Sequence, residues 1–86
     1  MFVRHSVNDY AGWRKVYDDF DPVRSQLGVV GKGVYQAVGE PNDVTVTHDF
    51  NTIEDAKGFA DSEELNTAMK SAGVAGQPEV WFTEPD

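Results

Sequence analysis

The feature that most constrains the fold of this chain is the order in which its hydrophobic periodicity changes. Residues 2–7 and 43–50 alternate apolar and polar side chains, the period of a β-strand, and 33–38 and 79–83 are further short runs typical of strands. Between them, residues 9–27 and 52–72 repeat apolar side chains every three or four positions, as amphipathic helices do. The sequence therefore predicts the order strand, helix, strand, strand, helix, strand.

The first helical segment has a clear start and an internal break. Asp9 is expected to be its N-cap, because a carboxylate there accepts hydrogen bonds from the free amides of the first turn. Proline removes an amide donor, so Asp21-Pro22 is expected to interrupt the helix, with Asp21 capping a second piece that stops at Gly28. The inner face is expected to carry a stripe of apolar residues: Trp13, Val16, Tyr17, Phe20, Val23 and Leu27.

The second helical segment repeats this arrangement. Thr52, with Asp55 three residues later, resembles a capping box, and Asp61 is expected to start a further piece that ends at Gly73. Turn-forming residues at 39–43 predict a hairpin between the two middle strands. The inner face of this segment is expected to consist of Ile53, Ala56, Phe59, Ala60, Leu65, Ala68, Met69 and Ala72.

The economical packing of these elements is an α+β fold. It has one four-stranded antiparallel sheet, in the order 4-1-3-2, with both helices on one face, which is the ferredoxin-like arrangement. The fold spans residues 1–86 as a single domain, and with 86 residues and no cysteine its core is small and unsupported by disulfides. The sheet face without helices carries residues such as Phe2, so we expect a homodimer in which two sheets pack face to face.

The charge balance narrows the possible partners. Lys and Arg number 7 against 15 Asp and Glu, a net charge of −8, which argues against nucleic acid or an anionic membrane surface as a partner. No stretch reaches the ~20 consecutive apolar residues of a membrane-spanning helix, and the first residues lack a signal-peptide pattern. We therefore expect no membrane partner and a cytoplasmic location.

Several segments resemble the dimeric α+β barrel superfamily, in particular its antibiotic-biosynthesis-monooxygenase-like and polyketide-cyclase-like proteins. The resemblance covers nearly the whole chain, and packing and capping motifs carry it. These motifs are Val7-Asn8-Asp9-Tyr10-Ala11-Gly12-Trp13, Pro41-Asn42-Asp43-Val44, Phe50-Asn51-Thr52-Ile53-Glu54-Asp55-Ala56, Ser62-Glu63-Glu64-Leu65 with Met69, and Ala72-Gly73-Val74.

The resemblance implies an α+β barrel dimer and a range of activities. The superfamily includes cofactor-independent quinone-forming monooxygenases, polyketide cyclases, haem-degrading enzymes, muconolactone isomerases and members without known activity. A plant polyketide cyclase in it also has a histidine at the place of His5. That cyclase's helix tyrosine and catalytic histidine fall on Phe59 and near Leu65 here, so the same acid–base arrangement cannot operate. The haem-degrading branch implies an axial histidine on a helix, and the predicted helices have none.

His5 and His48 are the only histidines of the chain. Each shares strand parity with valines, so both imidazoles are expected to point toward the helices. Because the first and third strands are neighbours in the predicted sheet, the imidazoles are expected to line one cavity, where a desolvated histidine can act as a general acid or base. The alternative is a pair of core histidines hydrogen-bonded to carbonyls or a tyrosine. We expect no metal site, since the nearby carboxylate of Asp49 lies on the opposite strand face.

The large aromatic side chains form a second candidate group. They are expected to pack between sheet and helices, either as plain hydrophobic core or as the wall of a site for a small aromatic ligand. The hydroxyl groups of Tyr17 and Tyr35 can orient or protonate an enolate, and the resemblance to monooxygenases implies a substrate contact at Trp13 or Trp81. The candidate substrate-binding residues are Trp13, Phe20, Tyr35, Phe50, Phe59, Met69 and Trp81.

Three hypotheses about function follow from these residues. The first is a monooxygenase- or cyclase-like enzyme without a cofactor, which acts on a small aromatic or polyketide-like molecule with His5, His48 and Tyr17 as catalytic residues. The second is a non-catalytic dimer that binds a hydrophobic ligand or serves as an accessory protein. The third is a structural dimer whose apolar residues are all core.

Overall fold

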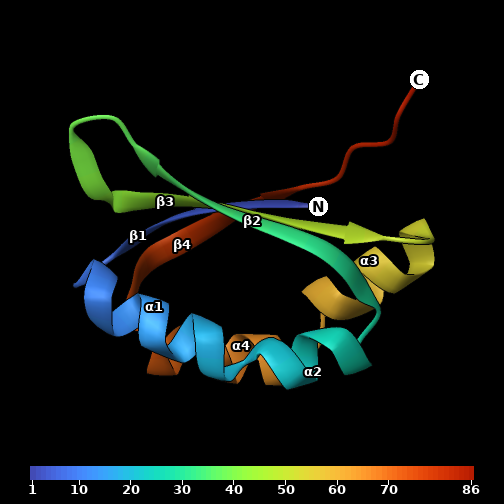
Figure 1. The fold of residues 1–86 in the computed structure, drawn as a ribbon, viewed down its shortest axis with the longest axis horizontal. Helices are drawn as coiled ribbons and strands as arrows, with labels where there is room; N and C mark the ends of the chain where they lie inside the picture. The colour runs from blue at the N-terminus through green and yellow to red at the C-terminus, as the bar shows by residue number, and fades with distance from the viewer.

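The computed structural model describes residues 1–86 and has one four-stranded antiparallel sheet with helices on one face (Figure 1). The strands are β1 (Phe2–Val7), β2 (Val29–Ala37), β3 (Glu40–Phe50) and β4 (Val74–Trp81). The helices are α1 (Tyr10–Asp19), α2 (Asp21–Gln26), α3 (Ile53–Ala60) and α4 (Glu63–Ser71). The strand order β2-β3-β1-β4 is the predicted ferredoxin-like order, seen from the other edge.

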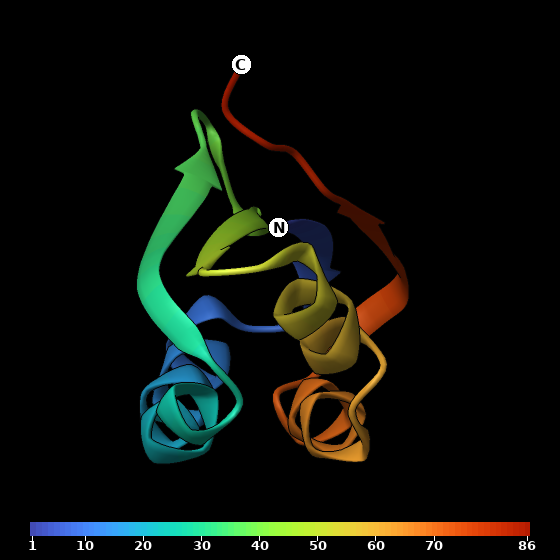
Figure 2. The same ribbon diagram turned by 90° about the vertical axis from the view of Figure 1, so that its right-hand side faces the viewer.

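The two helix pairs lie side by side beneath the curved sheet, and no helix covers its opposite face (Figure 2). On the helix side, Val3 of β1 pairs with Val46 of β3, and both are buried. On the uncovered side, Phe2 pairs with Thr47. The predicted alternation of β1 and β3 is therefore confirmed, and it directs the buried residues of both strands toward the helices. None of the helices is long and apolar enough to cross a membrane.

Two of the four predicted N-caps are confirmed and two are wrong by one residue. Asp9 accepts a hydrogen bond from the amide of Gly12 at 3.0 Å, and Thr52 accepts one from the amide of Asp55. Asp61, in contrast, still has helical backbone angles (φ −91, ψ −1), and the extended residue after it, Ser62, caps α4 instead. An N-cap needs extended backbone to aim its oxygen at the free amides, so the first extended residue takes the position.

The boundary between α1 and α2 has no extended residue. Phe20, with helical backbone angles (φ −78, ψ −9), is both the C-cap of α1 and the N-cap of α2, and its side chain makes no capping bond. Asp21 therefore lies in the first turn, and its carboxylate bonds instead to the side chains of Arg24 and Lys32. The predicted helix end at Gly28 is confirmed by its positive φ of 99.

The strands are longer than predicted. β2 begins at Val29 instead of residue 33, β3 begins at Glu40 so that only residues 38–39 form the turn, and β4 covers 74–81 instead of 79–83. Local β-propensity is low at Gly31, Gly33 and Pro78, and pairing with neighbouring strands overrides it. Pro78 is tolerated because β4 is an edge strand.

The core is thin. Only 12 of 86 residues are fully buried, and α4 contributes none of them. Ile53, predicted to face inward, is instead 41% exposed at the start of α3. A fold with so few buried residues has little stability to lose, which makes the polar groups in its interior significant.

Candidate functional site

A cavity of about 50 Å³ lies between the sheet and the helices. β1 and β3 form its roof, and α1, α2 and α4 form its floor and sides. Its wall is formed by Val3, His5, Trp13, Tyr17, Phe20, Arg24, Val46, His48, Leu65, Ala68, Met69 and Ala72. The cavity therefore brings together all three predicted catalytic residues and three of the seven predicted substrate-binding residues, namely Trp13, Phe20 and Met69.

The two histidines stand at different ends of this cavity. His5 pairs with Val44 across the sheet, whereas His48 lies opposite Met1, four residues farther along β3. At about 3.3 Å per residue, the two Cα atoms are about 13 Å apart along the strand direction. This spacing prevents a direct hydrogen bond between the two imidazoles, and neither ring has a hydrogen-bond partner.

Each imidazole packs against a different aromatic row. The His5 ring lies 5.6 Å from Trp13, which stacks on Tyr17 at 5.0 Å, so this row follows α1. The His48 ring lies 5.0 Å from Phe59, which in turn contacts Phe50 at 5.5 Å. Phe59 and Phe50, predicted as substrate contacts, thus lie behind His48 and outside the cavity wall.

Arg24 is the site residue that sequence reasoning missed. Its side chain is only 2% exposed and lies on the cavity wall, with its guanidinium carbon 4.0 Å from the centre of the Tyr17 ring. One terminal nitrogen donates to the carbonyl oxygen of Tyr17 at 2.7 Å, and the other donates to Asp21 at 3.0 Å. A signal for it existed in the sequence: residues 17, 20 and 24 share one helical face, so a cation lies on the apolar stripe.

The polar groups of the cavity lack partners within the chain. Six buried side-chain nitrogen or oxygen atoms have no hydrogen-bond partner: both ring nitrogens of His5 and of His48, the Tyr17 hydroxyl and Nε of Arg24. All four residues line the same cavity, and none is more than 8% exposed. An unpartnered buried polar atom costs roughly 1–3 kcal/mol, so a cluster of them in one place is typical of a site that receives a ligand.

Burial also sets the protonation states. Desolvation, reinforced by the positive charges of Arg24, the N-terminus and Lys32, lowers the pKa of His48 to about 3. Desolvation lowers the pKa of His5 as well, while the carboxylate of Asp43 acts in the opposite direction. The pKa of Tyr17 is raised by burial, against the effect of the cations around it. Both histidines are therefore neutral at pH 7, and Tyr17 keeps its proton.

Two predicted substrate contacts lie on the other side of the sheet. Trp81 pairs with Phe2 and Tyr35 pairs with Thr45, both on the uncovered face, where they are 40% and 60% exposed. They cannot touch a molecule in the cavity beneath the sheet. The prediction placed them in the site because aromatic residues were expected to pack between sheet and helices, whereas their strand positions direct them outward.

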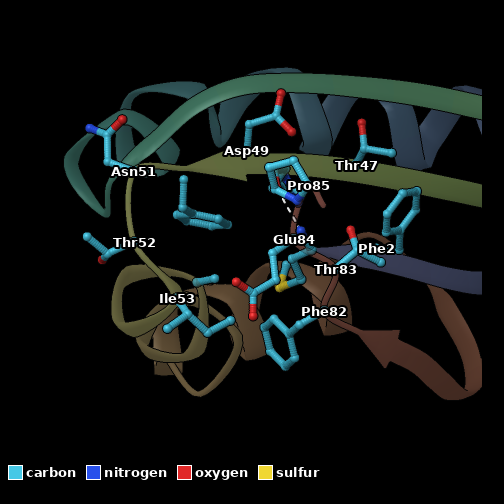
Figure 3. A pocket seen from close by; sticks show the side chains of 14 residues that line it. Phe2, Thr47, Asp49, Asn51, Thr52, Ile53, Phe82, Thr83, Glu84 and Pro85 are labelled. Atoms are coloured by element: carbon cyan, nitrogen blue, oxygen red, sulfur yellow. Dashed lines mark hydrogen bonds between the residues drawn. The ribbon is translucent and has the colours of Figure 1, made fainter.

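A second, larger cavity of about 410 Å³ lies where β3, the start of α3 and the C-terminal segment meet. Figure 3 shows the side chains around it, with Phe82, Thr83, Glu84 and Pro85 facing the β3 residues. Its wall is largely exposed, and of the residues with unpartnered buried polar atoms only His48 borders it. We therefore place the candidate site in the smaller cavity, where the buried polar groups converge.

No group of three or more His, Asp or Glu side chains is arranged so that it could hold a metal ion. Asp49, considered with the histidines as a metal ligand, is exposed on the uncovered sheet face, as its strand position predicted. The chemistry available in the cavity is thus that of two neutral imidazoles, one phenol and one guanidinium.

The fold of this chain is similar to that of solved structures. No protein-family model and no curated protein matches the sequence. A candidate antibiotic biosynthesis monooxygenase from Bordetella bronchiseptica has a similar structure, with a TM-score of 0.84 and 16% identity over 99% of this chain and 93% of that one. A candidate antibiotic biosynthesis monooxygenase from Nitrosomonas europaea aligns with a TM-score of 0.71 and 12% identity over 91% and 80%. The chain shares the ferredoxin-like fold of these proteins, as the resemblance in its sequence implied.

Proposed function

We propose that this monooxygenase-like fold binds a small aromatic or polyketide-like molecule beneath its sheet and removes a proton from it without a cofactor. The observation that carries the proposal is the convergence of six unpartnered buried polar atoms on one otherwise apolar cavity. Apolar walls with a few converging polar groups are typical of small-molecule sites. The names of the two similar structures support an oxidative outcome.

His5 is the proposed proton acceptor. Its end of the cavity is near the carboxylate of Asp43, which favours a positive charge on the imidazole, whereas Arg24 and Lys32 oppose one on His48. A neutral His5 nitrogen takes a proton from a carbon next to a carbonyl group. The electron pair of that C–H bond forms a C=C bond, and the π pair of the carbonyl group moves onto its oxygen. The Tyr17 hydroxyl, kept protonated by burial, donates a hydrogen bond to the resulting enolate oxygen.

Anthrone is a suitable probe, because loss of a C10 proton gives an enolate that reacts directly with oxygen. One anthrone and one O₂ yield one anthraquinone and one water, so quinone formation and oxygen uptake must agree. Replacing C10 protons by deuterium in D₂O without oxygen measures proton removal alone. We expect His5→Gln, which keeps a hydrogen-bonding side chain without a basic nitrogen, to slow both reactions about 100-fold.

The control is Lys15→Ala on the exposed side of α1, which leaves the cavity unchanged and is expected to keep the wild-type rate. Equal rates for wild type and His5→Gln would contradict the assignment of His5. An unchanged deuterium exchange with slow quinone formation would place His5 in the oxygen step instead.

The second candidate function is binding without catalysis. Burial lowers the pKa of both histidines, which favours this candidate because a less basic imidazole is a poorer proton acceptor. In this case an aromatic ligand binds the cavity with equal affinity in wild type and His5→Gln, and neither protein exchanges the anthrone protons. If no ligand enters the cavity at all, the groups around it belong to a structural core, which is the third hypothesis.

We also propose that the protein works as a homodimer joined through the uncovered sheet face. Phe2 and Trp81 stack there at 5.2 Å with an interplanar angle of 4°, and Tyr35 lies on the same face. An exposed group of aromatic rings next to a thin core is typical of a surface that another subunit covers.

Sedimentation at micromolar concentration is expected to show the mass of a dimer. Trp81→Asp removes a stacked ring and places a charge on this face, so we expect the dimer dissociation constant to rise at least 30-fold, as for loss of an aromatic hot spot. Ala11→Asp adds the same charge on the exposed side of α1 and is expected to leave the dimer intact. A wild-type monomer at this concentration would refute the proposal.

A further inference from the structure

The guanidinium of Arg24 is anchored through two of its three nitrogens. Its two terminal nitrogens donate to the Tyr17 carbonyl oxygen and to Asp21, and its central carbon lies 4.0 Å from the centre of the Tyr17 ring. Nε has no partner, although the side chain is 2% exposed and borders the cavity. A buried cation whose orientation is fixed by protein contacts, with one nitrogen left without a partner, is suited to bind an anion.

The positive charges near Arg24 are not fully compensated by carboxylates, so an anion can be bound there. Three cations lie over the Tyr17 ring, from Arg14, Arg24 and Lys32. Only two carboxylates pair with them: Asp18 with Arg14, and Asp21 with both Arg24 and Lys32. Asp21 is half exposed and shared between two cations, so it compensates the buried charge of Arg24 only in part. This end of the cavity is positive in a chain whose net charge is −8.

The two ends of the cavity also differ in charge and polarity. His48 lies near Arg24 and Lys32, whose charges act on it, while His5 lies at the other end beside Trp13. A molecule in the cavity thus meets a positive end and an apolar end with one neutral imidazole. Phe20 and Met69 contribute apolar surface to the same wall.

We propose that the ligand is an aromatic or enolisable carboxylic acid, with its carboxylate on Nε of Arg24 and its ring toward Trp13. This inference rests on the proposed function only in placing the reactive carbon near His5; the carboxylate contact stands without it. A single carboxylate matches the single net positive charge at this end of the cavity. A phosphate dianion would leave a charge uncompensated and lacks the apolar surface that the opposite end accepts.

The size of the cavity predicts how such a ligand enters. About 50 Å³ holds only a few water molecules, at roughly 10–15 Å³ each, so a benzene ring requires the wall to move. α4 is the wall without a fully buried residue, and Met69 on it has a flexible side chain. Ligand binding is therefore expected to displace α4 outward and leave the β1–β3 pair unchanged.

The test compares benzoate with benzamide, which has nearly the same shape but no charge, by NMR titration of the full chain. We expect benzoate to bind at least 10-fold more tightly, to shift the Arg24 Nε–H resonance and to perturb amides of α4. Arg24→Met keeps the apolar stem and is expected to weaken benzoate binding 10- to 100-fold while removing the preference over benzamide. Lys15→Met removes an exposed charge elsewhere on α1 and is expected to bind as wild type does.

Equal affinity for benzoate and benzamide, or an Arg24 Nε–H resonance that does not move, would overturn the proposal. Inorganic phosphate bound as tightly as benzoate would replace it with a general anion site. The Nε–H measurement uses the wild-type protein, so it decides the question even if Arg24→Met does not fold. The wild-type protein separates the two proposals: if it binds benzoate but does not turn over anthrone, the result counts against the proposed enzyme alone. His5→Gln is expected to keep benzoate binding.

Discussion

Lowering the pH from 7 to 4.5 is expected to reduce the free energy of unfolding by about 2.5 kcal/mol through His48 alone. The pKa of His48 is about 3 in the folded protein, against 6.5 for an unperturbed histidine. Between these two values the unfolded chain binds a proton that the folded chain does not, so acid favours unfolding. The loss begins near pH 6.5, grows by about 1.4 kcal/mol per pH unit and ends near pH 3.

His5 adds to this effect in the same direction, because burial lowers its pKa too. The carboxylates whose pKa values are lowered, Asp21 and Asp43, contribute only below about pH 4, where their unfolded forms begin to protonate. The window from pH 6.5 to 4.5 therefore reports the histidines. The charged groups that oppose protonation of His48 are Arg24, the N-terminal ammonium and Lys32.

Urea unfolding at pH 7, 6, 5 and 4.5, at one fixed protein concentration, measures this dependence. His48→Met replaces the imidazole by an apolar side chain of similar size and is expected to remove most of the slope. It also eliminates two unpartnered nitrogens, so we expect its stability at pH 7 to equal or exceed that of the wild type. A wild-type stability that stays constant from pH 6.5 to 4.5 would show that the imidazoles are not desolvated.

Phe59→Ala is expected to destabilise the fold by about 3–5 kcal/mol. Phe59 is 1% exposed and its ring contacts those of His48, Phe50 and Phe20 at 5.0, 5.5 and 6.3 Å. Removal of the ring leaves a cavity in the core, and the backbone of the sheet cannot move in to fill it. Because small domains have a total stability of about 5–15 kcal/mol and this core is thin, we expect the variant to be largely unfolded at 37 °C.

Circular dichroism during thermal and urea unfolding measures the loss in Phe59→Ala. Phe82→Ala is the matched control, since this ring is 37% exposed beyond the end of β4, and we expect a change below about 1 kcal/mol. If the free energy of unfolding of Phe59→Ala is within 1 kcal/mol of the wild-type value, the packing of Phe59 contributes little to the stability of the core.

The strongest sequence signals were those in which neighbouring residues carry the information. The alternation around Val44, Val46 and His48 predicts both the strand and the face that each side chain occupies, because successive residues of a strand point to opposite sides. Thr52 with Asp55 and the stop at Gly28 are similarly local, since a cap or a left-handed turn depends on a few adjacent residues.

Errors arose where distant residues decide the outcome. β4 begins at Val74 because β1 supplies partners for residues with little strand propensity of their own. Tyr35 and Trp81 looked like ligand contacts by residue type, yet the register places them on the uncovered face. Arg24 lay on the predicted apolar stripe, and its bonds to Asp21 and to the carbonyl oxygen of Tyr17 are local, but its burial depends on residues of β1, β3 and α4 that line the same cavity.

The sequence by itself determined the order of the elements, the ferredoxin-like fold and the direction in which His5 and His48 point. These follow from periodicity and capping, which are properties of the local backbone. Only the tertiary structure decided that the Cα atoms of the two histidines lie about 13 Å apart along the strands, that a buried guanidinium lies near one of them, and that six buried polar atoms of the cavity residues lack partners. Those facts depend on strand register and on how helices pack against the sheet, and contacts between residues distant in sequence set both.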